Sequence, residues 1–430
     1  MMKTEDLIKD LSRFPLLEAL FGRRSRRFGL GMEIPSGPLQ YTSRHEAVDL
    51  TPLERAVLLV CGCGVSGWNA GLEHTASANP KSGCNYAVRH TGRTFASGAG
   101  ALSAELMVTD DSGTFITKFR DIRPDSWRQF ENGFDAEKFL QIVGDHSVKL
   151  SDGRVVIPNE LPHVPSHNQW SVGKSGTTLF VPVVDMTVYM LNLIGIYLGM
   201  GFIPYDTTHD RPCGDLLPHV RSGTLNEVRR FPLCEIEQHV LASCAIEAGQ
   251  ICHNLVLTLQ AMGLGGWMFT GLNSYSLLGS SAEQGIPGFG FRFQRDERWP
   301  SPNPVGIDGH FEALCPPYQR DMKAAVESFI KMKFGEGGTY DPKKPGPFRE
   351  NARIKNEIER YSPEMVEILT KVATYIFETY GKFPSSVSSI YSRPCVQAQH
   401  IDHEYYDKFY GSDSYLESHR DHMCKWHSQG

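Results

Sequence analysis

The stretch EAGQICHNLVLTLQAMGLGGWMFTGL, residues 247–272, constrains the fold more than any other part of the chain. Residues 240–262 are apolar on nearly every side, which predicts a helix buried on most of its faces. Gly263, Gly265 and Gly266 follow at once. One glycine in the left-handed conformation is enough to end a helix, so the other two indicate that the chain next passes close to another group.

The size and composition of the chain are typical of a globular protein. Its 430 residues allow two ordinary domains or one large domain with insertions. Hydrophobic residues make up 40% and charged residues 21%, and the net charge of -6 gives no reason to expect nucleic acid as a partner. The apolar run at 188–203 is too short for a membrane span, so we interpret it as a core or dimer-interface helix. The N-terminus has no signal-peptide pattern and the ten cysteines form no framework, so we expect a cytoplasmic protein without a membrane partner.

Periodicity and turn residues predict interspersed helices and strands. Apolar residues at helical spacing and capping residues indicate helices, and alternation or short β-branched runs indicate strands. The expected elements are a helix over 4–21, a helix capped by Thr51, a hairpin over 101–122, a short helix within 127–145, a strand over 177–186 and a helix over 362–381. We see no internal repeat.

The chain is divided by a segment at 334–350 that is dense in glycine, proline and charge, which indicates a linker. We therefore expect a first domain over 1–335 with an insertion around 123–176. Residues 336–430 are expected to form a helical or irregular C-terminal extension.

Two segments carry residue types that suit an anionic, planar ligand. RRSRR, residues 23–27, places four guanidinium groups and a hydroxyl directly after a helix, and arginine forks bind phosphate oxygens bidentately. In RHTGRTFASGAGALSAEL, residues 89–106, a Ser-Gly-Ala-Gly run lets backbone amides approach a ligand without Cβ atoms in the way. The alternatives are a solvated charge run for the first segment and a flexible turn for the second.

The order of these segments resembles the nitroreductase superfamily of FMN-dependent oxidoreductases. An Arg-Arg-Ser-x-Arg segment follows the first helix, a Ser-Gly-Ala run enters a strand, and EAGQICHNLVLTLQAMGLG ends in Gly-Leu-Gly. The chain is similar in particular to the branch that oxidises azoline rings in modified peptides, over roughly residues 15–120 and 177–320. The resemblance implies an α+β fold, with a central antiparallel or mixed sheet flanked by helices.

The resemblance also implies which residues bind FMN. The resemblance assigns Arg23, Arg24, Ser25 and Arg27 to the phosphate and ribityl chain of FMN. It assigns Ser97, Gly98 and Ala99 to the isoalloxazine ring. Thr270 and Gly271 are assigned to the N5 and O4 edge of that ring. Arg393 and Arg292 are both candidates for a further contact to the phosphate. On this interpretation the surplus glycines let the chain pass beside the flavin. Superfamily members build each flavin site at a subunit interface, so a homodimer is implied.

We therefore expect an FMN-dependent dehydrogenase or NAD(P)H-dependent reductase that acts on a small organic or peptide-derived substrate. The chain departs from azoline-oxidising members, which carry a Lys-Tyr pair before the Glu-Ala-Gly helix, because EVRRFPLCEIEQ stands there instead. No catalytic side chain is identified, although histidines and tyrosines of 204–220 or of the tail could donate protons. The alternative within this fold is a non-catalytic protein that binds flavin or another ligand.

Three further motifs suggest other chemistry. SVGKSGTT, residues 171–178, is similar to the end of a phosphate loop, but Asn168 stands where the first glycine is required. Cys61 and Cys63 in CGCG are interpreted as two buried small residues. A metal-dependent enzyme is the alternative suggested by the tail residues His400, Asp402, His403, His419, His422, Cys424 and His427. Their spacing matches no zinc pattern, so we expect a polar surface tail without a metal.

Overall fold

The computed structural model describes residues 4–71, 87–124, 135–391 and 393–427. Its helices are α1 (Thr4–Ser12), α2 (Leu16–Gly22), α3 (Pro52–Cys63), α5 (Ala136–Asp145), α6 (Met186–Gly199), α7 (Leu217–Arg221), α8 (Leu233–Met262), α9 (Ser274–Leu278), α10 (Met322–Phe334), α11 (Asn351–Glu357), α12 (Pro363–Tyr380), α13 (His403–Phe409) and α14 (Glu417–Trp426). Its strands are β1 (Glu33–Ile34), β2 (Tyr41–Thr42), β3 (Val65–Trp68), β4 (Thr91–Arg93), β5 (Ala104–Asp110), β6 (Gly113–Thr117), β7 (Ser147–Ser151), β8 (Thr178–Asp185), β9 (Ile203–Asp206), β10 (Arg211–Pro212), β11 (Arg230–Pro232), β12 (Gly265–Phe269), β13 (Arg292–Gln294), β14 (Asn303–Ile307), β15 (Phe311–Glu312), β16 (Ile390–Tyr391) and β17 (Cys395–Gln399).

The central sheet is antiparallel, in the order β12-β17-β8-β5-β6-β7, and β16 pairs with the end of β8. The predicted strand at 177–186 is confirmed as β8, and the predicted hairpin as β5 and β6. Phe180 and Val184 pack into one hydrophobic cluster, whereas Val181 and Val183 pack into the cluster on the opposite face. Because β8 is buried on both faces, its sequence is apolar almost without alternation.

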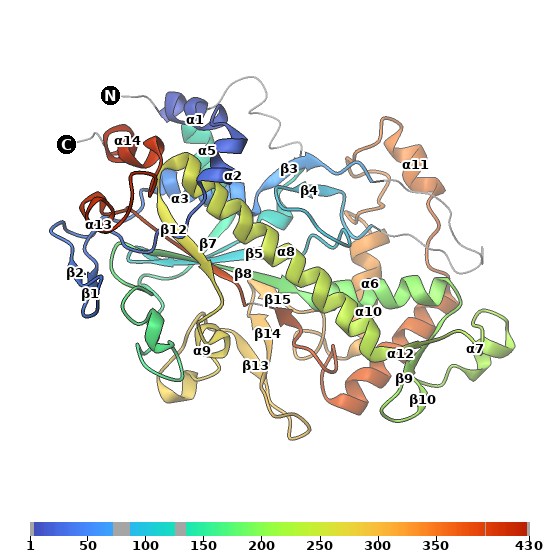
Figure 1. Cartoon of the computed structure of the whole chain (residues 1–430). Coiled ribbons are helices and arrows are strands. Elements are labelled where there is room, and N and C mark those ends of the chain that lie inside the picture. The colour runs from blue at the N-terminus through green and yellow to red at the C-terminus, as the bar shows by residue number, and fades with distance from the viewer. Residues whose placement is uncertain (1–3, 72–86, 125–134, 392, 428–430) are drawn as a thin grey trace.

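Helix α8 contains the predicted helix at 240–262 and begins earlier, at Leu233, so that it has 30 residues. Figure 1 shows it crossing the sheet, with α6, α10 and α12 toward its N-terminal end and α2, α3 and α14 toward its C-terminal end. By length and composition alone α8 could cross a membrane, but 50% of its apolar window is buried inside the protein. Its packing on β8, α3 and α6 accounts for that composition. The apolar run at 188–203 forms α6, which is also buried.

The glycines after α8 are explained by neighbouring parts of the protein. Gly263 caps the helix with φ 83°, as predicted. A Cβ at Gly263 would overlap the carbonyl of Ser418, and one at Gly265 would overlap the side chain of Ile401. One at Gly266 would overlap α8 and β17. Packing against neighbouring protein segments therefore accounts for all three glycines, and the passage of the following residues beside a flavin stays a prediction.

The predicted helix at 4–21 is divided into α1 and α2 at Pro15, which precedes the first residue of α2. Proline lacks an N–H, so it suits the start of a helix and not its interior. Helix α2 buries Ala19 but leaves its large apolar side chains exposed. Leu16, Leu17 and Phe21 are 66%, 65% and 78% exposed.

The segment beyond residue 335 completes the central sheet. Strand β17 lies between β12 and β8, and α12 packs against α6 and α10. The described residues of this segment, up to 427, therefore share a sheet and a core with the rest of the chain. In the predicted insertion, α5 and β7 lie beyond the hairpin, and the helix expected within 127–145 is described from residue 135 onward, since 127–134 lie outside the described residues.

Candidate functional site

The basic segment at residues 23–27 lies beside the strand that leads to Thr270 and Gly271. The backbone N–H of Arg26 donates to the carbonyl of Gly266 at 3.2 Å, and Nε2 of Gln399 donates to the carbonyl of Arg26 at 2.8 Å. The backbone of the basic segment therefore lies alongside the end of the sheet where β12 begins and β17 ends. Two of the three sequence motifs are neighbours in the fold.

Arg26, the variable position of the motif, is its most buried member at 2% exposure. Its guanidinium donates to Oε1 of Gln260 at 2.5 Å, to the carbonyl of Ser414 at 2.8 Å and to the carbonyl of Gly22 at 3.1 Å. Burial lowers the pKa of Arg26 to about 10, so it stays protonated at neutral pH. Arg26 therefore joins the N-terminal segment to α8 and to the C-terminal tail. The motif Arg-Arg-Ser-x-Arg allows any residue at position 26, so the sequence did not indicate this structural role of Arg26.

Arg27 is connected to Gly271 through one side chain. Its Nη2 donates to Oδ1 of Asn168 at 3.0 Å and to Oγ of Ser171 at 2.9 Å, and Nδ2 of Asn168 donates to the carbonyl of Gly271 at 3.0 Å. The guanidinium lies over the ring of Trp267 at 3.9 Å from its centroid. Two donors here, Nε of Arg27 and Nε1 of Trp267, are buried with no hydrogen-bond partner among the described residues. Asn168 and Trp267 were not among the predicted site residues.

A cavity of about 650 Å³ opens beside the basic segment. One side is formed by residues 24–28, and an aromatic side is formed by Trp170, Tyr405, Tyr406 and Tyr410. The hydroxyl of Tyr406 accepts the backbone N–H of Phe28 at 3.1 Å. Burial raises the pKa of Tyr406, so its hydroxyl keeps its proton. The cavity thus combines cationic side chains, hydroxyl donors and ring faces.

Residues 97–99 lie apart from the basic segment, against the middle of helix α8. Oγ of Ser97 and the backbone N–H of Leu102 donate to Oε1 of Glu247 at 2.5 and 2.7 Å, and burial raises the pKa of Glu247. Twelve helical residues, about 18 Å, separate Glu247 from Leu259, the residue that packs against Gly266. Among the described residues, no hydrogen bond or ion pair joins 97–99 to the basic segment or to Gly271. Ala99 is buried and Gly98 is exposed.

The two candidates for a late phosphate contact lie apart from the cavity, and neither lines it. Arg292 lies in β13 and is within 3.9 Å of Asp308. Arg393 is exposed and precedes β17, at the end where Cys395 pairs with Phe269. The exposed Thr270 follows that same end of β12.

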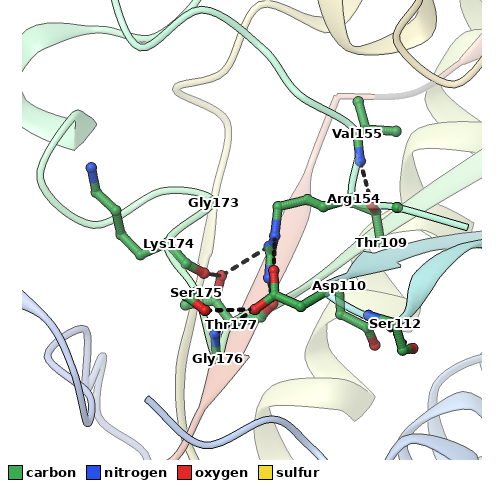
Figure 2. Close-up of polar contacts among 12 residues, drawn as sticks. Thr109, Asp110, Ser112, Arg154, Val155, Gly173, Lys174, Ser175, Gly176 and Thr177 are labelled. Atoms are coloured by element: carbon green, nitrogen blue, oxygen red, sulfur yellow. Dashed lines mark hydrogen bonds and ion pairs between the residues drawn. The ribbon is translucent and has the colours of Figure 1, made fainter. Parts of the chain in front are cut away.

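The loop that is similar to a phosphate loop is filled by a carboxylate. Oδ2 of Asp111 accepts the backbone N–H of Gly176 at 2.9 Å and the hydroxyl of Ser175 at 2.8 Å, while Nε of Arg154 donates to Oδ1 of Asp111 at 2.8 Å. Figure 2 shows Arg154 directed at this loop and the side chain of Lys174 extending away from it. Because Asp111, from the turn between β5 and β6, already occupies these donors, the loop does not present them to a phosphate.

Two other sequence interpretations have clear outcomes. Of the two cysteines predicted to be buried, Cys63 is buried and burial raises its pKa to about 12, in agreement with a structural thiol, whereas Cys61 is only half-buried. The interpretation of the tail as a polar surface segment is wrong at His400, His419 and His422, which are all buried. The tail folds back as α13 and α14, and α14 packs against α8.

Comparison with known proteins gives little further information. No family model matches the chain, and no curated protein matches it. One matching solved structure is a crystal structure of a protein from Ralstonia eutropha JMP134 that is provisionally described as a nitroreductase. It is 14% identical, the alignment covers 60% of this chain and 71% of that chain, and the TM-score is 0.28. A TM-score of this size does not establish a shared fold, so the family remains a proposal.

Proposed function

We propose that this chain binds FMN beside Arg27 and acts as an FMN-dependent oxidoreductase of the nitroreductase type. The observation that carries the proposal is the pair of unpartnered donors, Nε of Arg27 and Nε1 of Trp267, at the basic segment that the resemblance assigns to the cofactor. An unpaired buried donor costs about 1–3 kcal/mol, and Arg27 lines the cavity although Trp267 does not, so a ligand whose acceptor oxygens reach Nε of Arg27 is favoured. FMN offers phosphate, ribityl and ring oxygens.

The surrounding residues fit this cofactor. The cavity of about 650 Å³ lies within the usual range for cofactor sites of roughly 300–1,000 Å³. Arg24 and Ser25, which line the cavity, would add donors to the phosphate together with the exposed Arg23 that precedes them, and the aromatic side chains would cover apolar parts of the ligand. The protonated hydroxyl of Tyr406 would be available as a donor. When bound, FMN would supply the two-electron chemistry that no side chain here provides.

We also propose that the protein is a homodimer and that residues 97–99 serve the flavin site of the other subunit. These residues lie on α8 away from the basic segment of their own chain, with Gly98 beside Ile246, which is 46% exposed. The exposed leucines and phenylalanine of α2 form an apolar surface near the C-terminal end of the same helix. A second copy would cover both surfaces.

Identification of the bound chromophore tests the proposed function. The purified protein is expected to be yellow, and heat is expected to release FMN. Bleaching by NAD(P)H supports a reductase, and bleaching only by an organic donor supports a dehydrogenase. Bound FMN that no donor bleaches favours the non-catalytic alternative. Protein that contains no flavin and gains none on incubation with FMN contradicts the proposal.

A further inference from the structure

Three histidines from the C-terminal part of the chain converge on one carboxylate inside the protein. Glu54 lies in the first turn of α3, His400 directly follows β17, His422 lies in α14, and His427 directly follows α14. One ligand atom from each residue lies within 4.8 Å of the corresponding atoms of the other three. Among the described residues, no other set of three or more histidine, cysteine or acidic side chains converges in this way.

The four side chains are enclosed by protein. Side-chain exposure is 0% for Glu54, 1% for His400, 2% for His422 and 16% for His427. The Nε2 atoms of the three histidines lie 3.4, 2.7 and 3.0 Å from Oε1 of Glu54, in the order of the sequence. One carboxylate oxygen is thus surrounded by three imidazole nitrogens.

The hydrogen bonds on the far side of two rings fix their tautomers. Nδ1 of His400 lies 2.9 Å from the carbonyl of Val48, and Nδ1 of His422 lies 2.7 Å from the carbonyl of Met262. A carbonyl oxygen only accepts, so each Nδ1 carries a proton; a neutral ring then keeps a lone pair on Nε2, whereas a protonated ring donates its Nε2–H to Glu54. In the neutral form both lone pairs face Oε1 of Glu54, which is also an acceptor. Acceptors this close repel one another unless a proton or a metal ion lies between them.

The other oxygen of Glu54 is already committed. Oε2 accepts the backbone N–H of Thr51 at 2.6 Å, as part of the capping box at the start of α3. Only Oε1 remains free to bind a metal, together with three imidazole nitrogens. Four nitrogen and oxygen ligands suit tetrahedral zinc, whereas magnesium and calcium prefer more ligands and oxygen alone.

We propose that Glu54, His400, His422 and His427 bind one Zn²⁺ ion. All four positions are filled by protein, so the site is structural and leaves no position for a substrate. The Nδ1–H groups bonded to backbone carbonyls are the outer contacts that orient histidine ligands in metal sites. This inference does not depend on a flavin.

The zinc site would hold the C-terminal segment in place. Through His422 it fixes α14 against the end of α8, where Met262 accepts the ring N–H. The segment between His400 and α14 includes Tyr405, Tyr406 and Ser414, which line the cavity beside the basic segment. Loss of the ion is therefore expected to loosen one wall of that cavity.

The experiment measures zinc in the full-length protein after dialysis against metal-free buffer and after reconstitution with Zn²⁺. We expect about one bound ion per chain in the wild type. The variant His427→Ala changes the least buried ligand and is expected to reduce zinc affinity at least roughly 100-fold. Its control is His45→Ala, which removes an exposed histidine and is expected to retain wild-type zinc content.

A second readout needs no variant. Removal of zinc from the wild type by a chelator is expected to lower Tm by several degrees, and added Zn²⁺ is expected to restore it. Wild-type protein that binds no zinc on reconstitution, or a chelator that leaves Tm unchanged, overturns the proposal. So does a folded His427→Ala variant that binds zinc as tightly as His45→Ala.

Discussion

Arg26 and Arg27 are adjacent in the sequence but lie in different surroundings. The side chain of Arg26 is buried with three protein acceptors, whereas Arg27 keeps a donor without a partner among the described residues. The first arrangement is typical of a structural residue and the second of a ligand-binding one. A variant of Arg26 is therefore expected to change stability, whereas a variant of Arg27 is expected to change ligand binding.

Arg26→Ala is expected to lower the free energy of unfolding by about 2–4 kcal/mol, because Oε1 of Gln260 and two carbonyls lose a charged donor. The matched variant Arg24→Ala changes an exposed residue of the same segment and is expected to cost less than about 0.5 kcal/mol. Urea unfolding measures both. Equal losses in the two variants would show that Arg26 is not a structural anchor.

Lys382 makes stability depend on pH. It is 3% exposed and lies over the ring of Trp299, and burial lowers its pKa from 10.5 to about 7. Between pH 7 and 10.5 the unfolded chain therefore binds a proton that the folded protein lacks, so stability is expected to rise with pH across that range. The variant Lys382→Met is expected to weaken this rise in urea unfolding midpoints. The exposed Lys343→Met serves as the control, and an unchanged slope in Lys382→Met would contradict the account.

The sequence predicted the position of the basic segment but not its neighbours. Its pattern selects residues 23–27 because charge and spacing are local properties. Asn168 and Trp267 reach Arg27 only through the folded chain, and Glu54 meets His400 across 346 positions of sequence. A short sequence motif cannot include two residues that are so far apart in the chain. The same limit explains why the His-rich tail showed no zinc pattern.

At the scale of elements, the end of α8 depends on Gly263. Its φ is 83° and a Cβ there would overlap the Ser418 carbonyl, so Gly263→Ala is expected to cost about 1–3 kcal/mol and to loosen α14. Gly144→Ala in α5 is the control, because no atom lies within 4 Å of its Cβ position. Thermal unfolding measures both variants. A Gly263→Ala protein as stable as the Gly144→Ala protein would contradict this account of the cap.

The elements with the strongest local pattern were predicted correctly. The apolar run of β8, the turn of the β5–β6 hairpin and the capping box at Thr51 each follow from neighbouring residues. The break at Pro15 was missed because the helical spacing of apolar residues continues across it. The exposure of the apolar side chains of α2 is therefore explained by where the helix breaks, and the periodicity of the sequence does not predict it.

At the scale of the whole molecule, the exposed side chains of α2 predict self-association. The paired substitution Leu17→Glu with Phe21→Glu is expected to convert a dimer into a monomer, because two charges would enter the proposed apolar interface. Light scattering coupled to gel filtration measures the mass. Val228→Glu changes an apolar residue that is 86% exposed near β11 and is the control. A wild-type monomer at micromolar concentration, or a dimer that survives the paired change, would contradict the prediction.

The arrangement of the sheet was only partly accessible from the sequence. A mixture of helices and strands was predicted, and the antiparallel order of β5, β6 and β8 agrees with the implied fold class. The placement of β17 between β12 and β8 was not predicted, since the segment CVQAQ carries no signal for its partners. Strand partners far apart in sequence are chosen by packing of the complete core.

The central claim is that FMN binds beside the N-terminal arginines, and the flavin content of one double variant tests it most directly. Arg23→Ala with Arg27→Ala is expected to purify, and to remain after incubation with FMN, with less than roughly a tenth of the wild-type flavin, because the phosphate loses two charged donors. The control Arg320→Ala with Arg353→Ala removes the same charge from exposed positions and is expected to keep full flavin. A folded Arg23→Ala/Arg27→Ala protein that holds as much FMN as the wild type would contradict the claim.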